Sequence, residues 1–404
     1  MHNALIYSPG LDGHRQVYVF VLANILEELN FNIYIACNVY QKVFNSFYFD
    51  KLKTKLGITI IDTGKYSEVG LKITHSQFLE LQNQLCVDLT ILPEADHHLE
   101  LLTSQLPKKK NSLRGKLVGI FLRPFYYYHN MGLLGKLRYV KHLPSRWKTD
   151  ERLFHELLLD RFALLDKALY IDENYVQYHH KRVWIPDMFQ QYADMVGHYE
   201  TADQRIWIER LNEFKSKNSD RFLFLYFGTA QYRRGYDILL KIAVDLDGCF
   251  IHCGLRNKNE NFALEIDSLR DSLGKKGQLF ETNQFIEDPI CVEAFFRSVS
   301  HLILPYRNFY GSSGVMLQAL SYGIPVLAPE AGLIGHRIKK YNLGFTFNEK
   351  NPKSLLTQCR GFIQTDPRDF ELPIQRYMHF QTADNLKECL VRVLNDTGAF
   401  LDHP

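Results

Sequence analysis

Short apolar segments of strand length recur along this chain and alternate with longer segments of helical periodicity, in two successive series. The first series begins with a strand at residues 4–7, a glycine-containing turn at 8–14, a helical segment at 17–29 and a second strand at 31–36. Strands that alternate with helices of this length predict βαβ units and a mostly parallel sheet. The alternation therefore restricts the chain to an α/β fold of doubly wound sheets.

The second series begins after a polar stretch at residues 215–220, with a new strand at 221–227. The remaining strands are expected at 58–61, 87–92, 117–122, 168–171 and 183–185 in the first series, and at 249–253, 277–280, 301–304, 325–327 and 344–346 in the second. The length of 404 residues suits two domains, since a domain typically takes about 150 residues. We expect Rossmann-like domains over 1–205 and 206–382 that face a cleft, and a C-terminal helix over 383–404 that could pack back on the first domain.

The composition argues against several functional classes. A net charge of +3 gives no sign of a nucleic-acid partner. The 7 cysteines include no CxxC pair and several lie in apolar segments, which indicates buried free thiols in a reducing compartment. The segment 249–253 holds two of them with a histidine, but it is expected to be a core strand, because no second pair of metal ligands lies nearby.

The N-terminus has no signal-peptide features. No segment reaches the roughly 18 consecutive apolar residues of a membrane-spanning helix. We therefore expect a cytoplasmic protein.

The residues after the strand at 301–304 carry the strongest functional signal. Gly311, Ser312, Ser313 and Gly314 form a small-residue turn that opens a helix. Free backbone N–H groups and the positive end of a helix dipole favour a diphosphate, and small side chains let it approach the backbone. A second interpretation is equally open, in which these residues are only a tight turn with a serine N-cap.

This segment resembles the donor site of family 4 retaining glycosyltransferases, which have the GT-B architecture. The resemblance rests on the strand, the proline, the small residues, the helix and the closing Gly323-Ile324-Pro325-Val326. A second stretch, Phe227-Gly228 followed by Arg234-Gly235-Tyr236-Asp237, is similar to the phosphate-binding turn of that family. The resemblance is best over 221–350 and weaker over 1–200.

The resemblance implies transfer of a sugar from a nucleoside-diphosphate sugar to a glycan, lipid-linked or protein acceptor, without a metal or another cofactor. It also implies the donor-binding residues, which are Gly13, Thr229, Arg233, Arg234, Ile286, Gly311, Ser312, Ser313, Gly314 and Gln318. Arg234 lies where the family has a phosphate-binding lysine, and Thr229 replaces a cationic phosphate ligand.

Two glutamates of the family, eight positions apart, are replaced here by Tyr310 and Gln318. Gln318 can still hydrogen-bond a ribose hydroxyl. Tyr310, the expected neighbour of the transferred sugar, cannot supply negative charge beside a developing oxocarbenium ion. We expect retention of configuration, and an inactive GT-B homologue that acts as a binding or partner subunit stays open as the alternative.

Two histidines of the first domain are candidate catalytic residues. His14 closes the turn after the first strand and resembles the general base of inverting GT-B enzymes, although a plain turn histidine is an equally simple interpretation. The turn lacks the Gly-x-Gly-x-x-Gly fingerprint, so no dinucleotide cofactor is expected. His97 and Asp96 follow the strand at 87–92, where they could contact the acceptor or form a solvated helix cap.

Arg123 leaves the strand at 117–122 beside several aromatic residues, which suits contact with a sugar or an anion. Lys108, Lys109, Lys110 and the basic segment at 135–148 could contact an anionic membrane surface. A solvated surface loop is the competing interpretation of that segment.

Overall fold

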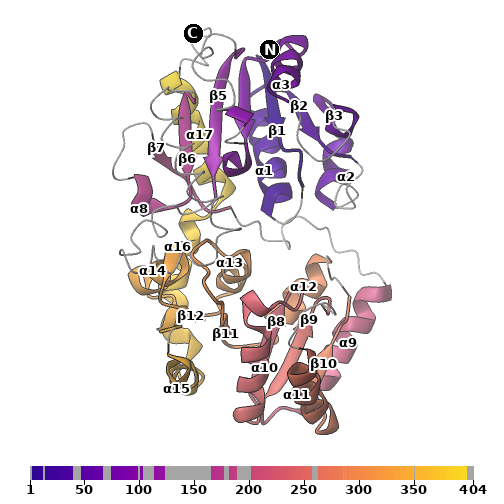
Figure 1. Cartoon of the computed structure of the whole chain (residues 1–404), viewed down its shortest axis with the longest axis vertical. Coiled ribbons are helices and arrows are strands. Elements are labelled where there is room, and N and C mark those ends of the chain that lie inside the picture. The colour runs from indigo at the N-terminus through magenta and orange to yellow at the C-terminus, as the bar shows by residue number, and fades with distance from the viewer. Residues whose placement is uncertain are drawn as a thin grey trace. The chain divides into compact units, whose positions relative to one another are not determined.

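The computed structural model describes residues 2–11, 14–39, 47–66, 74–98, 101–102, 113–122, 165–176, 182–188, 202–256, 263–284, 286, 288–349 and 351–397. The chain divides into two compact units (Figure 1). Unit 1 comprises Met1–Met188 with Gln381–Pro404, and unit 2 comprises Phe189–Phe380. The structure divides the chain between Met188 and Phe189, earlier than the expected boundary between residues 205 and 206.

Unit 1 contains a seven-stranded sheet in which every neighbouring pair of strands is parallel. Its strands, in spatial order, are β3 (Ile58–Asp62), β2 (Phe31–Cys37), β1 (His2–Tyr7), β4 (Leu89–Leu92), β5 (Lys116–Phe121), β6 (Lys167–Tyr170) and β7 (Arg182–Trp184). The chain builds outward from β1 in one direction and then, from β4, in the other. The sheet therefore has a switch point between β1 and β4, where doubly wound proteins bind ligands at the carboxyl ends of the strands.

Within its described residues, unit 1 has the helices α1 (His14–Glu28), α2 (Phe47–Lys53), α3 (His75–Gln84), α8 (Glu173–Val176) and α17 (Ala383–Thr397). The buried residues of α17 are Leu386, Cys389, Leu390, Val393 and Leu394, which is the spacing of one apolar helix face. Helix α17 contacts α1, and Lys387 at its surface pairs with Glu28 at 2.6 Å. The C-terminal helix thus belongs to the core of unit 1.

Unit 2 contains two three-stranded sheets, each made of parallel strands, and one edge strand of each sheet contacts the other sheet. The strands are β10 (Leu279–Glu281), β9 (Cys249–Cys253) and β8 (Leu223–Phe227) in one sheet, and β11 (Leu302–Ile303), β12 (Val326–Pro329) and β13 (Gly344–Phe347) in the other. Strands β8 and β11 are neighbours, and one hydrophobic core runs through both sheets. From β8 the chain adds β9 and β10 on one side, and from β11 it adds β12 and β13 on the other side. The switch point of unit 2 therefore lies between β8 and β11.

The helices of unit 2 are α9 (Ala202–Lys217), α10 (Tyr236–Asp245), α11 (Ala263–Lys275), α12 (Pro289–Phe296), α13 (Gly314–Ser321), α14 (Gly332–Tyr341), α15 (Pro352–Phe362) and α16 (Glu371–Phe380). None of the helices in the described ranges is long and apolar enough to cross a membrane. All seven cysteines are free thiols, six of them buried and Cys86 exposed.

Candidate functional site

Two loops meet at the switch point of unit 2, one after β8 and one after β11. Gly235 joins the short turn η7 (Tyr232–Arg234) to α10 and has φ +71°. A Cβ atom at Gly235 would lie 2.0 Å from the carbonyl oxygen of Pro305, so only glycine allows the loops to approach this closely. The backbone N–H of Arg307 also donates to the carbonyl of Arg233 at 2.9 Å.

Arg307 holds the two loops together through its side chain. Its Nη1 and Nη2 atoms donate to the two carboxylate oxygens of Asp237 at 2.7 and 2.6 Å. Nη1 also donates to the carbonyl of Tyr232 at 2.5 Å, and the guanidinium lies 3.8 Å from the centre of the Tyr232 ring. Bidentate pairs of this kind are among the stronger polar contacts in proteins. The turn that carries Arg233 and Arg234 is therefore fixed against the loop after β11.

Arg234 lies against the backbone at the end of β8. Gly228 has φ +106°, and a Cβ atom there would be 2.6 Å from Nη1 of Arg234. Burial raises the pKa of Tyr306, and the charge of Arg234 partly opposes that effect. The Tyr306 hydroxyl lies 3.2 Å from Oγ of Ser313. Tyr306 therefore links the two motifs of the sequence, since its hydroxyl contacts Ser313 and its pKa responds to the charge of Arg234.

Helix α13 begins next to these residues. Ser313 is its N-cap, and its hydroxyl accepts a hydrogen bond from the N–H of Met316 at 3.2 Å. The predicted serine N-cap is therefore confirmed. The other N–H groups of the first turn still point toward the helix start. One turn later, Gln318 is only 5% exposed, and its Nε2 has no hydrogen-bond partner among the described residues. A buried amide donor without a partner costs free energy, and a ligand oxygen could satisfy it.

Tyr310 is held through its backbone. The carbonyl of Tyr310 accepts the N–H of Leu333 at 3.0 Å. Gly332, with φ +78°, packs so closely that a Cβ atom there would lie 2.5 Å from Cα of Tyr310. The loop 309–313 is thereby placed against the start of α14 as well as the start of α13.

The other predicted donor residues of unit 2 differ in exposure. Thr229 is half-buried, and its carbonyl accepts the Tyr226 hydroxyl at 3.1 Å. Arg233 is exposed, whereas Arg234 is half-buried. Ile286 is buried in the hydrophobic core of the unit, which leaves its backbone, rather than its side chain, for contact with a ligand.

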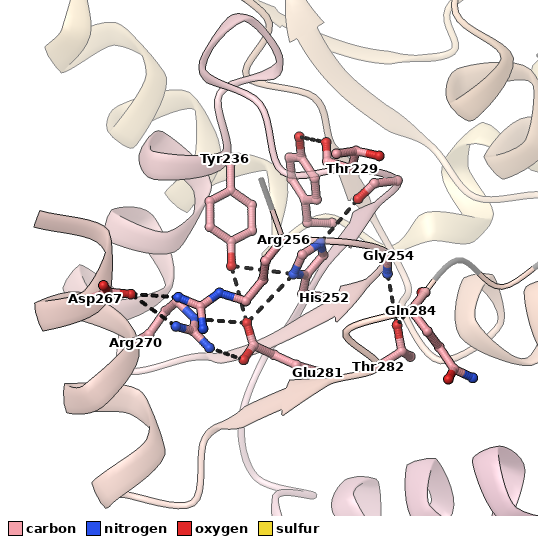
Figure 2. A network of polar contacts seen from close by, with 12 residues as sticks. Thr229, Tyr236, His252, Gly254, Arg256, Asp267, Arg270, Glu281, Thr282 and Gln284 are labelled. Atoms are coloured by element: carbon pink, nitrogen blue, oxygen red, sulfur yellow. Dashed lines mark hydrogen bonds and ion pairs between the residues drawn. The ribbon is translucent and has the colours of Figure 1, made fainter. Parts of the chain in front are cut away.

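A buried polar network lies beside the turn 228–236, at the ends of β9 and β10 (Figure 2). His252 places Nε2 3.1 Å from the carbonyl oxygen of Gly228. The Tyr236 hydroxyl donates to Oε1 of Glu281 at 3.3 Å, and Arg270 makes a two-bond ion pair with the same carboxylate. Burial raises the pKa of Glu281, but interactions with His252 and Arg270 outweigh it and hold the pKa at about 2. Glu281 is therefore a permanent anion at neutral pH.

Arg256 and Asp267 extend the network toward solvent. Nη2 of Arg256 donates to Asp267 at 2.7 Å, and Arg270 contacts the same carboxylate oxygen at 3.2 Å. None of these network residues was among the expected site residues. The one signal in the sequence was a histidine within an otherwise apolar strand, interpreted correctly as part of a core strand.

The switch point of unit 1 holds the predicted acceptor-side cluster. His97 ends the turn η3 (Ala95–His97), and its Nε2 lies 2.7 Å from Oε1 of Glu94. Asp96 is buried, and its Oδ2 accepts the backbone N–H of Leu122 at 2.8 Å. His98 is buried beside the ring of Tyr7 at 5.0 Å. The contact of Asp96 therefore supports the end of β5, while His97 and Glu94 form an acid–base pair.

Several predicted residues lie outside the described part of the chain. These are Gly13, Arg123, the lysines at 108–110 and the basic segment at 135–148. The backbone of His14 begins α1, but its side chain is outside the description. Among the described residues, no group of three or more histidine, cysteine, aspartate or glutamate side chains could hold a metal ion.

No protein-family model matches the chain, and no curated protein matches it by sequence. Solved structures do match. The chain is similar to a sucrose-phosphate synthase from Thermosynechococcus elongatus, with a TM-score of 0.68 and 13% identity over 99% of this chain and 100% of that chain.

It is also similar to HepE from Anabaena in complex with UDP and glucose, with a TM-score of 0.65 and 12% identity over 98% of this chain and 100% of that chain. The catalytic domain of starch synthase IV from Arabidopsis thaliana, bound to ADP and acarbose, matches with a TM-score of 0.61 and 12% identity over 98% of this chain and 99% of that chain. At identities this low the similarity establishes the fold. The chain has the GT-B fold, with two Rossmann-like units, and the fold class predicted from the sequence is confirmed.

Proposed function

We propose that this protein is a glycosyltransferase that moves a sugar from a nucleoside-diphosphate sugar to an acceptor, and that unit 2 binds the donor. The observation that carries the proposal is the switch point of unit 2. There the turn that carries Arg234 is tied to the loop that leads into α13, and α13 carries the unpartnered amide of Gln318. This arrangement suits an anion on the helix start and a hydroxyl on the amide.

The donor diphosphate binds at the N-terminus of α13 and on Arg234, and Gln318 binds the ribose. A helix N-terminus and an arginine can offset the charge of a leaving diphosphate, so the proposed reaction requires no metal. Two similar structures, HepE with UDP and starch synthase IV with ADP, support a nucleotide donor for a chain of this fold. Activity that survives treatment with EDTA would agree with the metal-independent form of the proposal.

The proposed mechanism is retaining, as in family 4. A front-face reaction needs no protein base but benefits from nearby negative charge, which Tyr310, the replacement of the family's glutamate, does not provide. The retaining proposal therefore rests on the resemblance of the segment 304–326 to family 4. An inverting reaction needs a base aligned with the acceptor hydroxyl, and the pair of His97 and Glu94 could provide one. The anomeric configuration of the product, measured by NMR, decides between the two.

The same replacement supports a second candidate, a GT-B protein without catalysis that acts as a binding or partner subunit. Hydrolysis or transfer of a bound nucleotide sugar by the purified protein would exclude it.

The proposed acceptor is a glycan, a lipid or a protein. Binding to acidic vesicles tests whether the basic segment at 135–148 contacts an anionic membrane surface. If that segment binds anionic lipid, the protein co-sediments with acidic vesicles at low salt and dissociates as the salt concentration rises.

A thermal-shift screen against UDP-, GDP-, ADP- and TDP-sugars tests the donor proposal, followed by calorimetry with the stabilising donor. The substitution Arg234→Ala should weaken binding by about 1.5–3 kcal/mol, the scale of a charge-assisted hydrogen bond. Arg368→Ala is the control, because Arg368 is exposed and pairs with Asp366 in the turn before α16. Equal donor affinity in the Arg234→Ala variant and the wild type would mean that the phosphates bind elsewhere.

A further inference from the structure

His252 is an unusual residue for the centre of a core strand. It lies in β9, which reads Cys249-Phe250-Ile251-His252-Cys253, and its side chain is fully buried. Nε2 lies 3.1 Å from the carbonyl oxygen of Gly228. A carbonyl oxygen can only accept, so Nε2 carries the proton in this contact. The imidazole of β9 thus donates a hydrogen bond to the Gly228 carbonyl, which directly follows β8.

The carbonyl that His252 holds is at the start of the turn that carries Arg234. The N–H of Gly228 donates to the carbonyl of Cys253 at 2.8 Å. Gly254 packs against the same peptide, since a Cβ atom there would lie 2.2 Å from the Gly228 oxygen. Gly228 in turn leaves the space that the Arg234 guanidinium occupies. A shift of the Gly228 peptide would therefore displace the guanidinium of Arg234, which packs against Gly228.

The far end of the same turn is tied to the same network. Tyr236 directly follows Gly235, and its hydroxyl donates to Glu281 and lies 3.5 Å from Nδ1 of His252. Glu281 lies 3.6 Å from that nitrogen and is held by Arg270. Figure 2 shows the His252 ring beside Glu281 and Tyr236, and the Nε2 atom of the ring contacts the Gly228 carbonyl. One buried network therefore anchors both ends of the turn 228–236.

We propose that His252 is a positioning residue for the donor phosphates: with Glu281 it fixes both ends of the turn 228–236 and so holds Arg234 in its binding position. This inference rests on the proposed function, in which Arg234 binds the diphosphate. A histidine that served only the packing of β9 would affect the stability of unit 2 but would leave the contribution of Arg234 unchanged. The two roles can therefore be separated by measurement.

The experiment compares His252→Leu, His252→Gln and His252→Asn in the full-length protein. Glutamine places its Nε2 the same number of bonds from Cβ as the Nε2 of histidine, so it can donate to the Gly228 carbonyl. Asparagine is one bond shorter and cannot reach it in the same way. His301→Leu is the matched control, because His301 is also buried in unit 2 but contacts Ser300 and Thr365.

Calorimetry with UDP, ADP, GDP and TDP, and with the corresponding nucleosides, gives the readout. For the diphosphate that binds, we expect His252→Leu and His252→Asn to lose affinity about tenfold, the equivalent of one hydrogen bond. We expect His252→Gln to retain most of it, and nucleoside affinity to stay unchanged. In the Arg234→Ala background, His252→Asn should cause little further loss, because the two residues act through one contact.

Two results would overturn the proposal: wild-type affinity for the diphosphate in His252→Asn, or losses that add fully in the double variant. Equal losses in His301→Leu would show a general loss of folding and would also count against it. If the wild type binds none of the four diphosphates, the proposed function itself fails, and that outcome is distinct because no variant is needed to see it. Should His252→Leu not fold, the comparison of glutamine with asparagine decides the matter.

Discussion

The switch points of the two units are built differently. In unit 2, contacts join the two loops on either side of the reversal, among them the close approach of Gly235 to Pro305 and the pair of Arg307 with Asp237. In unit 1, the turn after β4 pairs His97 with Glu94 within itself, contacts the end of β5 through Asp96 and Leu122, and reaches β1 through the ring contact of His98 with Tyr7.

The difference suits two chemical tasks, of which the second, proton transfer by the protein, is required only by the inverting alternative. A site for a diphosphate gains from rigid cations and helix ends that need no rearrangement when the ligand binds. A site for proton transfer needs a titratable group that can change its charge, such as a histidine beside a carboxylate. We therefore expect substitutions in unit 2 to change donor affinity, and substitutions at the unit 1 switch point to change turnover.

The largest effect should come from Gly235→Ala in unit 2. Alanine is strained at φ +71°, and its Cβ would be 2.0 Å from the Pro305 carbonyl oxygen, so both loops must move. We expect a loss of about 2–4 kcal/mol in the free energy of unfolding, together with loss of donor binding. Gly361→Ala in α15 is the control, since no atom lies within 4 Å of its added Cβ, and it should leave both properties intact. Denaturant unfolding and calorimetry measure them, and equal behaviour of the two variants would refute the close approach of the loops.

His97→Ala tests the unit 1 side of the comparison. If His97 acts as a base, kcat should fall by about 10²-fold or more while the donor Kd stays at the wild-type value. Glu94→Gln should cause a smaller loss of kcat, because it removes the partner of His97 and keeps the imidazole. An inverted product in the wild type, together with this loss, would overturn the retaining mechanism. A change in donor Kd without a change in kcat would break the division of tasks between the units.

Arg307→Ala tests whether the tie between the loops of unit 2 matters for binding. Removing the bidentate pair with Asp237 should cost about 1–2 kcal/mol in stability and weaken donor binding by a similar amount. Arg307→Lys should recover only part of this, since lysine cannot make the bidentate contact. Arg297→Ala is the control, because its pair with Glu293 is on an exposed helix surface. Thermal unfolding with and without donor would show the contrast, and identical shifts for Arg307→Ala and Arg297→Ala would argue against the tie.

The smallest effect should be the pH dependence contributed by Glu281. Its pKa is about 2 in the folded protein and 4.5 ordinarily, so its stabilising contribution is complete above about pH 5 and is lost as the pH falls toward 2. The stability difference between the wild type and Glu281→Gln should therefore be largest at pH 7. It should shrink by on the order of 1 kcal/mol between pH 5 and pH 3. Urea unfolding at a series of pH values measures it, and parallel profiles for the two proteins would contradict the buried ion pair.

Local patterns in the sequence predicted much of this fold. Alternating apolar segments located each described strand, and Ser313 with Gly314 located the start of α13. Arg234 and Gln318 came instead from the resemblance to family 4, and their roles in donor binding stay predictions. Asp96 shows the limit of such reasoning, since its carboxylate supports the backbone of a different strand.

The sequence by itself determined the two α/β series and the start of α13, because strand periodicity, helix caps and turn residues act over a few positions. Its resemblance to family 4 supplied the candidate donor-site motifs. Only the tertiary structure decided which distant residues meet. Arg307 and Asp237 are 70 positions apart, and His252 and Gly228 are 24 apart. These pairs form because parallel strands bring their carboxyl ends to the same edge of a sheet. The order of the strands, which depends on packing across the whole unit, selects which of those ends are neighbours.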